Sequence, residues 1–207
     1  MRTSTIAVVA GAVAVVGVAG MALAPRLLGS DDAFADCRGG QVAGGDLGGP
    51  FTLVNGAGQA VTDQEVFTEP SILYFGYTSC PDVCPLDMAR NAQAADILRE
   101  RGIEVTPVFV SVDPARDTPD VVGAYARNFG EDAIGLTGSP EQVDAAAKAY
   151  RVLYAKQDDD PEYYSVQHSA FSYLVLPGVG FVDFVNRDET PEGLADRMQC
   201  FAEAAGA

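Results

Sequence analysis

The stretch SILYFGYTSCPDVCP, residues 71–85, decides the fold of this chain. Residues 72–75 have the length and the aromatic and β-branched content of a buried strand, which Gly76 closes. Helix-forming residues with an apolar stripe follow the stretch, so a helix is expected directly after it. Cys80 and Cys84 are therefore predicted to lie between a buried strand and the N-terminus of a helix.

The loop that carries the two cysteines favours thiolate chemistry. Unpaired N–H groups in the first turn of a helix attract negative charge, so a thiolate forms there more readily than in bulk water. Pro85 is expected at the first helical position, where its missing N–H has no partner to lose, and this places Cys84 close to the N-cap. Gly102 is expected to follow the end of this helix.

Strands and helices alternate along the rest of the chain. Strands are expected at residues 51–54, 59–61, 105–112, 134–137, 172–176 and 181–185, and helices at residues 119–128, 140–150 and 191–205. This order predicts an α/β fold with a central, mainly parallel sheet, helices on both faces, an N-terminal β-hairpin and an antiparallel edge hairpin. A cysteine pair between a central strand and its helix is the arrangement of the thioredoxin-like fold.

The composition limits the partners. The chain has 207 residues, with 29 Asp and Glu against 13 Lys and Arg, for a net charge of −16, and it contains no basic run. This charge excludes nucleic acid as a partner and disfavours an anionic membrane surface. The length suits one globular domain of about 170 residues after an N-terminal segment.

The N-terminal segment has the composition of a membrane anchor. Residues 3–25 contain no charged side chain and are mostly Ala, Val and Gly. About 20 apolar residues span a bilayer, whereas the core of a cleaved signal has about 7 to 15, so an anchor is favoured over a signal cleaved near Ala35. We expect a transmembrane anchor at residues 1–25, a flexible linker at 26–49 and a thioredoxin-like domain at 50–207. The slight excess of positive charge before the anchor predicts that the domain lies outside the cytoplasm, on the periplasmic side in a bacterium.

The four cysteines are Cys37, Cys80, Cys84 and Cys200. An exported protein can form disulfides, and four cysteines allow three full pairings, among which their number alone does not choose. A structural disulfide between Cys37 and Cys200 would tie the two ends of the domain together. It is the expected pairing because Cys37 lies just after the apolar N-terminal segment and Cys200 in the last helix, and it leaves Cys80 and Cys84 for chemistry.

His168 is the only histidine, and it stands in YYSVQHSAF directly before the strand at residues 172–176. Most lone histidines are structural, but here the chain is expected to pass beside the cysteine loop. Cys80, Cys84 and His168 then form a three-ligand site that suits copper, since thiolates select Cu(I) and imidazole helps to hold Cu(II). Zinc is the rival metal, but a structural zinc site normally needs a fourth protein ligand, for which the sequence shows no pattern.

Disulfide exchange between Cys80 and Cys84 is the alternative to metal binding, and a peroxidase with one low-pKa cysteine is a third class. The redox motif of thioredoxins is C-x-x-C, whereas the spacing here is one residue wider. Thioredoxins also carry a cis-proline before the corresponding strand, where this chain has residues 168–170, HSA. Both features favour the metal site.

Five segments resemble the Sco/SenC family: YFGYTSCPDVCP, VFVSVDPARDTPD, GLTGSPEQV, AYRVLYAK and HSAFSYLV, which occur in this order within residues 49–197. The family comprises membrane-tethered, thioredoxin-fold copper proteins that help to assemble the dinuclear copper centre of cytochrome c oxidase. The resemblance implies that Cys80, Cys84 and His168 bind copper. It also implies two partners, the copper-bearing oxidase subunit and an upstream copper donor. The chain departs from the family pattern at Gln167, where an acidic residue is common, so the tuning of the imidazole or the partner surface is expected to differ.

Several residues near the site are expected to have structural roles. Asp82 is expected to be a carboxylate at the helix N-terminus, and Met88, Tyr74 and Tyr77 are expected to pack in the interior. A turn network that supports the cysteine loop is expected from Asp113, Arg116 and Asp117. Asp82 and Met88 are alternative copper ligands, and the turn network is an alternative partner contact.

Overall fold

The computed structural model describes residues 33–38, 47–157 and 163–206. Met1–Ala35 and Asp36–Ala207 are separate units, and all elements below belong to the second. The predicted anchor at residues 1–25 and most of the predicted linker lie outside the described residues. Within the part of the chain that is described, no helix combines the length and the apolar character needed to cross a membrane.

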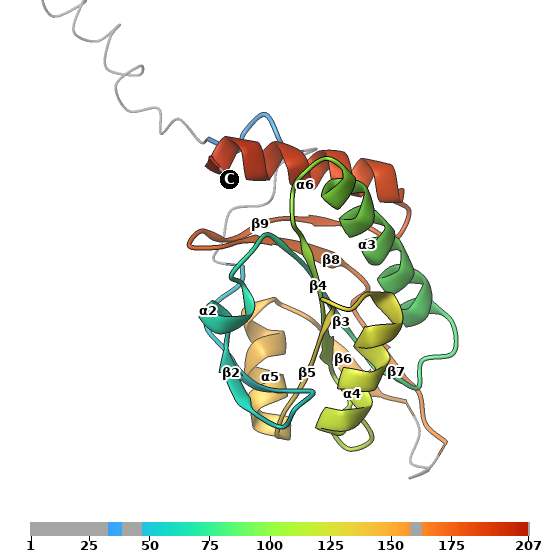
Figure 1. The fold of residues 1–207 in the computed structure, drawn as a ribbon. Helices are drawn as coiled ribbons and strands as arrows, with labels where there is room; N and C mark the ends of the chain where they lie inside the picture. The colour runs from blue at the N-terminus through green and yellow to red at the C-terminus, as the bar shows by residue number, and fades with distance from the viewer. Residues whose placement is uncertain (1–32, 39–46, 158–162, 207) are drawn as a thin grey trace, which may run out of the picture. The chain divides into compact units, whose positions relative to one another are not determined.

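A seven-stranded mixed sheet forms the centre of the second unit, in the order β2-β1-β5-β4-β3-β8-β9 (Figure 1). The strands are β1 (Thr52–Asn55), β2 (Ala60–Thr62), β3 (Ser71–Gly76), β4 (Thr106–Ser111), β5 (Ile134–Thr137), β8 (Ser172–Leu176) and β9 (Gly180–Val185). The three central strands β5, β4 and β3 are parallel, and the pairings on either side of them are antiparallel. The parallel part of the sheet is thus confined to its middle.

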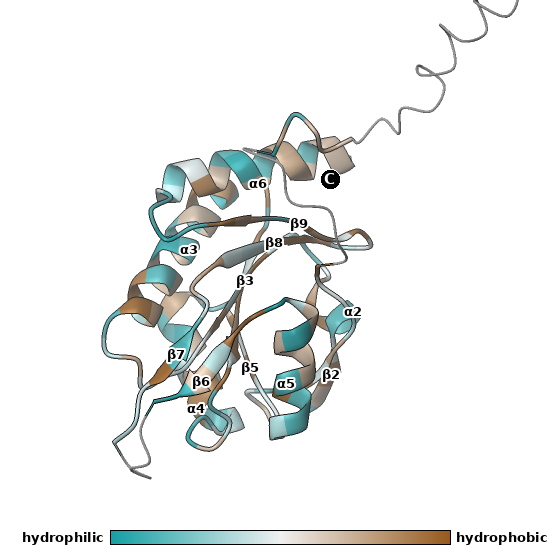
Figure 2. Cartoon of the chain, turned by 180° about the vertical axis from the view of Figure 1, so that it is seen from behind, coloured by the Kyte–Doolittle hydropathy of each residue, from teal (hydrophilic) through white to brown (hydrophobic). Residues whose placement is uncertain are grey.

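The helices cover both faces of the sheet. They are α2 (Asp63–Val66), α3 (Val83–Glu100), α4 (Pro119–Ala126), which continues as the 3₁₀ turn Arg127–Phe129, α5 (Pro140–Ala149) and α6 (Pro191–Ala205). The two opposite views place α3, α4 and α6 on one face and α5 on the other (Figures 1 and 2). The side chains of Ser139 and Thr190 cap α5 and α6, since they accept hydrogen bonds from the first turns of these helices.

The central strand β3 is buried along its whole length, as its apolar sequence predicts. Its large side chains pack with those of β4 and β8. In Figure 2 the strands are mostly brown, which marks hydrophobic residues, while the helices carry the teal, hydrophilic positions. Phe75 and Phe109, from β3 and β4, are fully buried in this core. The sheet is therefore the rigid support on which the cysteine loop is mounted.

Some elements differ from the sequence prediction. Helix α3 begins at Val83, two residues before Pro85, so Cys84 lies in its first turn. A second, two-stranded sheet of β6 (Tyr154–Lys156) and β7 (Val166–His168) was not expected, nor was the single turn α2. Three-residue strands are too short to show a clear alternation of apolar and polar residues, so the sequence carries little signal for them.

The register of β3 with β8 brings the histidine segment to the cysteine loop. Tyr74, near the end of β3, is paired with Ser172, the first residue of the antiparallel strand β8. The residues that precede β8 therefore arrive at the end of β3 from which the cysteine loop leaves. His168, the last residue of β7, lies in that segment.

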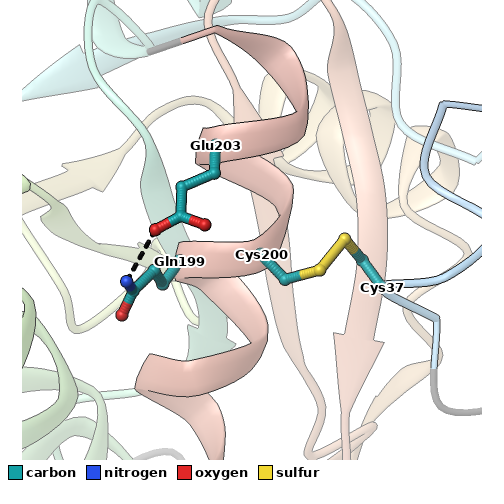
Figure 3. The surroundings of a disulfide bond; sticks show 4 residues. All are labelled: Cys37, Gln199, Cys200 and Glu203. Carbon is teal, nitrogen blue, oxygen red and sulfur yellow. Dashed lines mark hydrogen bonds between the residues drawn. A yellow bond between two sulfur atoms is a disulfide. The ribbon is translucent and has the colours of Figure 1, made fainter.

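A disulfide joins Cys37 to Cys200 in α6, across 163 residues of sequence (Figure 3). Next to it, Arg38 donates a hydrogen bond from Nε to the carbonyl of Val182, 3.4 Å away. This pairing leaves Cys80 and Cys84 as free thiols. The beginning of the unit is thus fastened both to the last helix and to the edge strand β9.

Candidate metal centre

Three side chains meet beyond the end of β3. The sulfurs of Cys80 and Cys84 and a ring nitrogen of His168 all lie within 4.8 Å of one another. Metal–ligand bonds to sulfur and nitrogen measure about 2.0–2.3 Å, so ligand atoms around one ion are at most about 4.6 Å apart. The three atoms are therefore close to the spacing that one bound ion requires.

Cys80 is the half-exposed member of the cluster. Its sulfur accepts a hydrogen bond from the backbone N–H of Cys84, with a nitrogen–sulfur distance of 3.4 Å. Burial alone would raise the pKa of Cys80, but the N–H groups of Cys84 and Asp82, together with the side chains of Cys84 and Tyr77, outweigh it and lower this pKa below its ordinary value of 9.0. The predicted effect of a helix N-terminus on the thiolate is thus seen at Cys80.

Cys84 is fully buried, and its environment has the opposite effect. Burial raises the pKa of its thiol well above the ordinary value, although the N–H of Tyr77 acts in the other direction. The sulfur fits into a space left by Gly76, because a Cβ added there would lie 2.9 Å from both Cys84 Sγ and Tyr74 Cε1. The glycine that closes β3 is therefore required by the packing of the second sulfur.

His168 presents one ring nitrogen to the cysteines. Its Nδ1 lies 3.0 Å from the carbonyl oxygen of Ser169, and because a carbonyl can only accept, this nitrogen carries the proton. Nε2 is then the acceptor nitrogen, and it lies 3.3 Å from Cys84 Sγ, whose thiol hydrogen it accepts in the metal-free protein. Burial lowers the pKa of His168 below 6.5, so the ring is neutral at pH 7 and able to bind a metal.

Tyr74 and Tyr77 both contact the imidazole. Each ring meets the ring of His168 edge to face, with centroids 6.0 Å apart. Burial, with added contributions from Cys84 and Asp87, raises the pKa of Tyr74 far above 10, so its hydroxyl keeps its proton. The predicted packing role of the two tyrosines is confirmed, and they also fix the plane of the histidine ring.

The turn after β4 supports the cysteine loop, as predicted. Asp117 accepts hydrogen bonds from the backbone N–H and the hydroxyl of Thr78, at 2.9 and 2.5 Å, and from the hydroxyl of Ser111 at 2.5 Å. Asp113 pairs with Arg116 at 2.5 Å. Asp117 therefore holds the cysteine loop at Thr78, and Asp113 fixes Arg116 within the turn.

The other residues near the site have the structural positions that were expected of them. Met88 is fully buried in the core, and Asp82 is the N-cap of α3, although its side chain makes no capping hydrogen bond. Gln167 is exposed on β7, beside a groove of about 360 Å³ that His168 and Leu153 help to line. The residue that departs from the family pattern thus faces solvent.

Comparison with known proteins shows the family of the chain. The family model described as SCO1/SenC matches residues 40–203. The chain belongs to the SCO1/SenC family. It is similar to the protein SenC of Rhodobacter capsulatus, with 49% identity over 205 residues that cover 98% of this chain and 91% of that protein.

Solved structures of this family share the fold. The structure of Arabidopsis thaliana ScoI with copper bound is 40% identical in sequence to this chain, with a TM-score of 0.72. The match covers 76% of this chain and 99% of the Arabidopsis chain. The structure of Bradyrhizobium japonicum ScoI with copper bound has 35% identity and a TM-score of 0.66, over 74% and 98% of the two chains. The predicted thioredoxin-like fold is confirmed.

Proposed function

We propose that this protein is a copper metallochaperone that binds copper through Cys80, Cys84 and His168 and delivers it to the copper-bearing subunit of cytochrome c oxidase. The observation that carries the proposal is the convergence of two thiols and an unprotonated imidazole nitrogen within 4.8 Å. Copper-bound relatives with the same fold support it. An upstream copper donor would load the site.

The donor set fits copper better than zinc. Two thiolates select Cu(I), and one neutral imidazole adds a ligand that suits Cu(II). Among the described residues, Cys80, Cys84 and His168 form a group of three candidate ligands, and no fourth His, Cys, Asp or Glu joins it. A closed structural zinc site usually has four protein ligands.

Thiol–disulfide exchange is the second candidate function, and one observation favours it. Cys80 is partly exposed with a lowered pKa, while Cys84 is buried with a raised one. This asymmetry suits an attacking thiol with a resolving partner behind it. Such an activity would act on the metal-ligand cysteines of the oxidase subunit or on other exported proteins.

The domain organisation expected from the sequence completes the proposal. Residues 1–25 would anchor the protein in the membrane, residues 26–49 would form the linker, with Cys37 and Arg38 fastened to the domain, and residues 50–207 would carry the site outside the cytoplasm. The disulfide between Cys37 and Cys200 supports an exported location, because structural disulfides persist in oxidising compartments.

Copper titration of the reduced full-length protein tests the function. We expect one copper ion per chain, measured with a competing chelator, and transfer to the metal-free copper domain of the oxidase subunit. Failure to bind copper stoichiometrically would overturn the proposal. Binding without transfer, together with rapid reduction of a disulfide in that subunit, would favour the thiol–disulfide function.

Gly76→Ala is expected to weaken copper binding at least about tenfold and to destabilise the fold by about 1–3 kcal/mol, the range for overpacked cores. The new Cβ would lie 2.9 Å from Cys84 Sγ and so displace it from His168. Gly49→Ala is the matched control, since its Cβ would meet only Ala149 at 3.5 Å. Chelator competition and urea unfolding measure the two effects, and equal results for both variants would contradict the prediction.

A further inference from the structure

A buried charged cluster lies directly behind the metal centre. Asp87, in α3 after Cys84, is 3% exposed, and its carboxylate oxygens are 3.5 Å from Arg90 Nη1 and 3.5 Å from Arg187 Nε. A buried carboxylate is costly unless its charge is paired and its oxygens are hydrogen-bonded. The two arginines satisfy the charge and fix the position of the carboxylate.

Arg90 is itself held firmly. It donates hydrogen bonds to the carbonyls of Asn186 and Arg187, at 3.1 and 3.0 Å, and to the hydroxyl of Ser172 at 2.7 Å. These groups belong to the start of β8 and the turn after β9. Through Arg90, Asp87 is thus anchored to the start of β8, the strand that follows His168 in the chain.

The Tyr74 hydroxyl connects this cluster to the ligands. It donates a hydrogen bond to Asp87 Oδ2 at 3.0 Å, and Tyr74 is fully buried. The ring between hydroxyl and backbone meets His168 edge to face, and its Cε1 borders the same small space as Cys84 Sγ. The position of the hydroxyl therefore sets where the ring lies against both ligands.

We propose that Asp87 is a positioning residue for the metal site, which acts by holding the Tyr74 hydroxyl so that the Tyr74 ring fixes His168 and Cys84. The inference rests on the proposed copper function. It assigns a role in metal binding to a residue that touches no ligand atom. Side chains behind the ligands commonly change metal affinity by about 10–100-fold when they are replaced.

Three variants test this role: Tyr74→Phe, Asp87→Asn and the double variant. We expect each single variant to weaken copper binding about tenfold, and the double variant to be no weaker than Tyr74→Phe, because Asp87 acts only through the hydroxyl. The proposal would be overturned if Asp87→Asn weakened copper binding by the same factor in the unchanged protein and in the Tyr74→Phe variant. Unchanged affinity in Tyr74→Phe would overturn it as well.

Asp183→Asn is the matched control for a merely structural role. Asp183 is also a buried carboxylate, 4% exposed and 3.4 Å from Arg197, but it lies on the edge strand β9. We expect Asp183→Asn to lower the unfolding temperature as Asp87→Asn does while copper affinity stays within about twofold, as for a site without shared partners. A tenfold loss of affinity in this control would show that lost stability alone explains the result.

A measurement without metal separates the inference from the proposed function. Because His168 is the only histidine, the metal-free protein gives one set of imidazole proton signals by NMR. We expect these signals to shift in Tyr74→Phe and Asp87→Asn and not in Asp183→Asn. If the unchanged protein bound no copper but the two variants still shifted the signals, the copper function would be refuted and the positioning role retained. If the signals did not shift in the two variants, the positioning role would be refuted.

Discussion

His168→Ala is expected to abolish Cu(II) binding and to weaken Cu(I) binding at least about 100-fold, beyond the upper range for residues behind the ligands. The imidazole is the only nitrogen ligand among the three, and its unprotonated Nε2 points toward Cys84. Cu(I) can remain bound to two thiolates, which it prefers, whereas Cu(II) loses the ligand that suits it. The absorption spectrum of the Cu(II) form and chelator competition for Cu(I) measure the two losses.

Gln167→Ala is the matched control for this variant. Gln167 is the neighbour of His168 on β7, but its side chain is exposed. We expect the Gln167→Ala variant to bind Cu(I) and Cu(II) with the same affinities as the unchanged protein. The metal site would be refuted if His168→Ala retained the copper stoichiometry and the spectrum of the unchanged protein. Thiol exchange that survives in that variant would then favour the oxidoreductase function.

Removal of the outer disulfide by Cys37→Ala together with Cys200→Ala is expected to lower the free energy of unfolding by up to about 5 kcal/mol. The bridge closes a loop with a sequence separation of 163 residues, and in the chain-entropy model so long a loop restricts the unfolded chain strongly. Replacing both cysteines avoids a free thiol that would exchange with Cys80. Urea unfolding of the oxidised protein and of the double variant measures the difference.

The fold around the metal centre should survive this change. The ligands are held by β3, α3 and β7, and α6 packs on α3 through its own apolar face. We therefore expect the double variant to bind copper with unchanged affinity at temperatures where it is folded. A free energy of unfolding within about 1 kcal/mol of the unchanged protein would contradict the disulfide prediction, since native bridges usually contribute about 2–5 kcal/mol.

The strands and helices with strong local signals were predictable from the sequence. The apolar run of β3, the start of α5 at Pro140 and the hairpin of β8 and β9 all occur where the pattern places them. The start of α3 was wrong by two residues, because Asp82 rather than Cys84 is the N-cap. The loop before this helix is held at Thr78 by Asp117, 39 residues away, a contact that no local pattern reports.

The residues of the candidate site were predictable, but their surroundings were not. Cys80, Cys84 and His168 are chemically distinctive, and the order of strands brings them together. Tyr74 reads as an ordinary interior residue of a buried strand, whereas Asp87, a charged residue in α3, reads as solvent-exposed, so no pattern predicts the hydrogen bond between them. The role of Gly76 depends on a sulfur in the next helix, which no local pattern reports.

The groove beside His168 has a kinetic consequence for the proposed function. Only three candidate ligand side chains of the described residues converge on the site, and a groove is lined in part by the histidine. With copper held by Cys80, Cys84 and His168, a ligand from a receiving protein would be able to join the ion before any of the three bonds breaks. Such an associative exchange separates affinity from lifetime, so a chaperone of this design can hold copper tightly in isolation and still release it quickly to the correct acceptor.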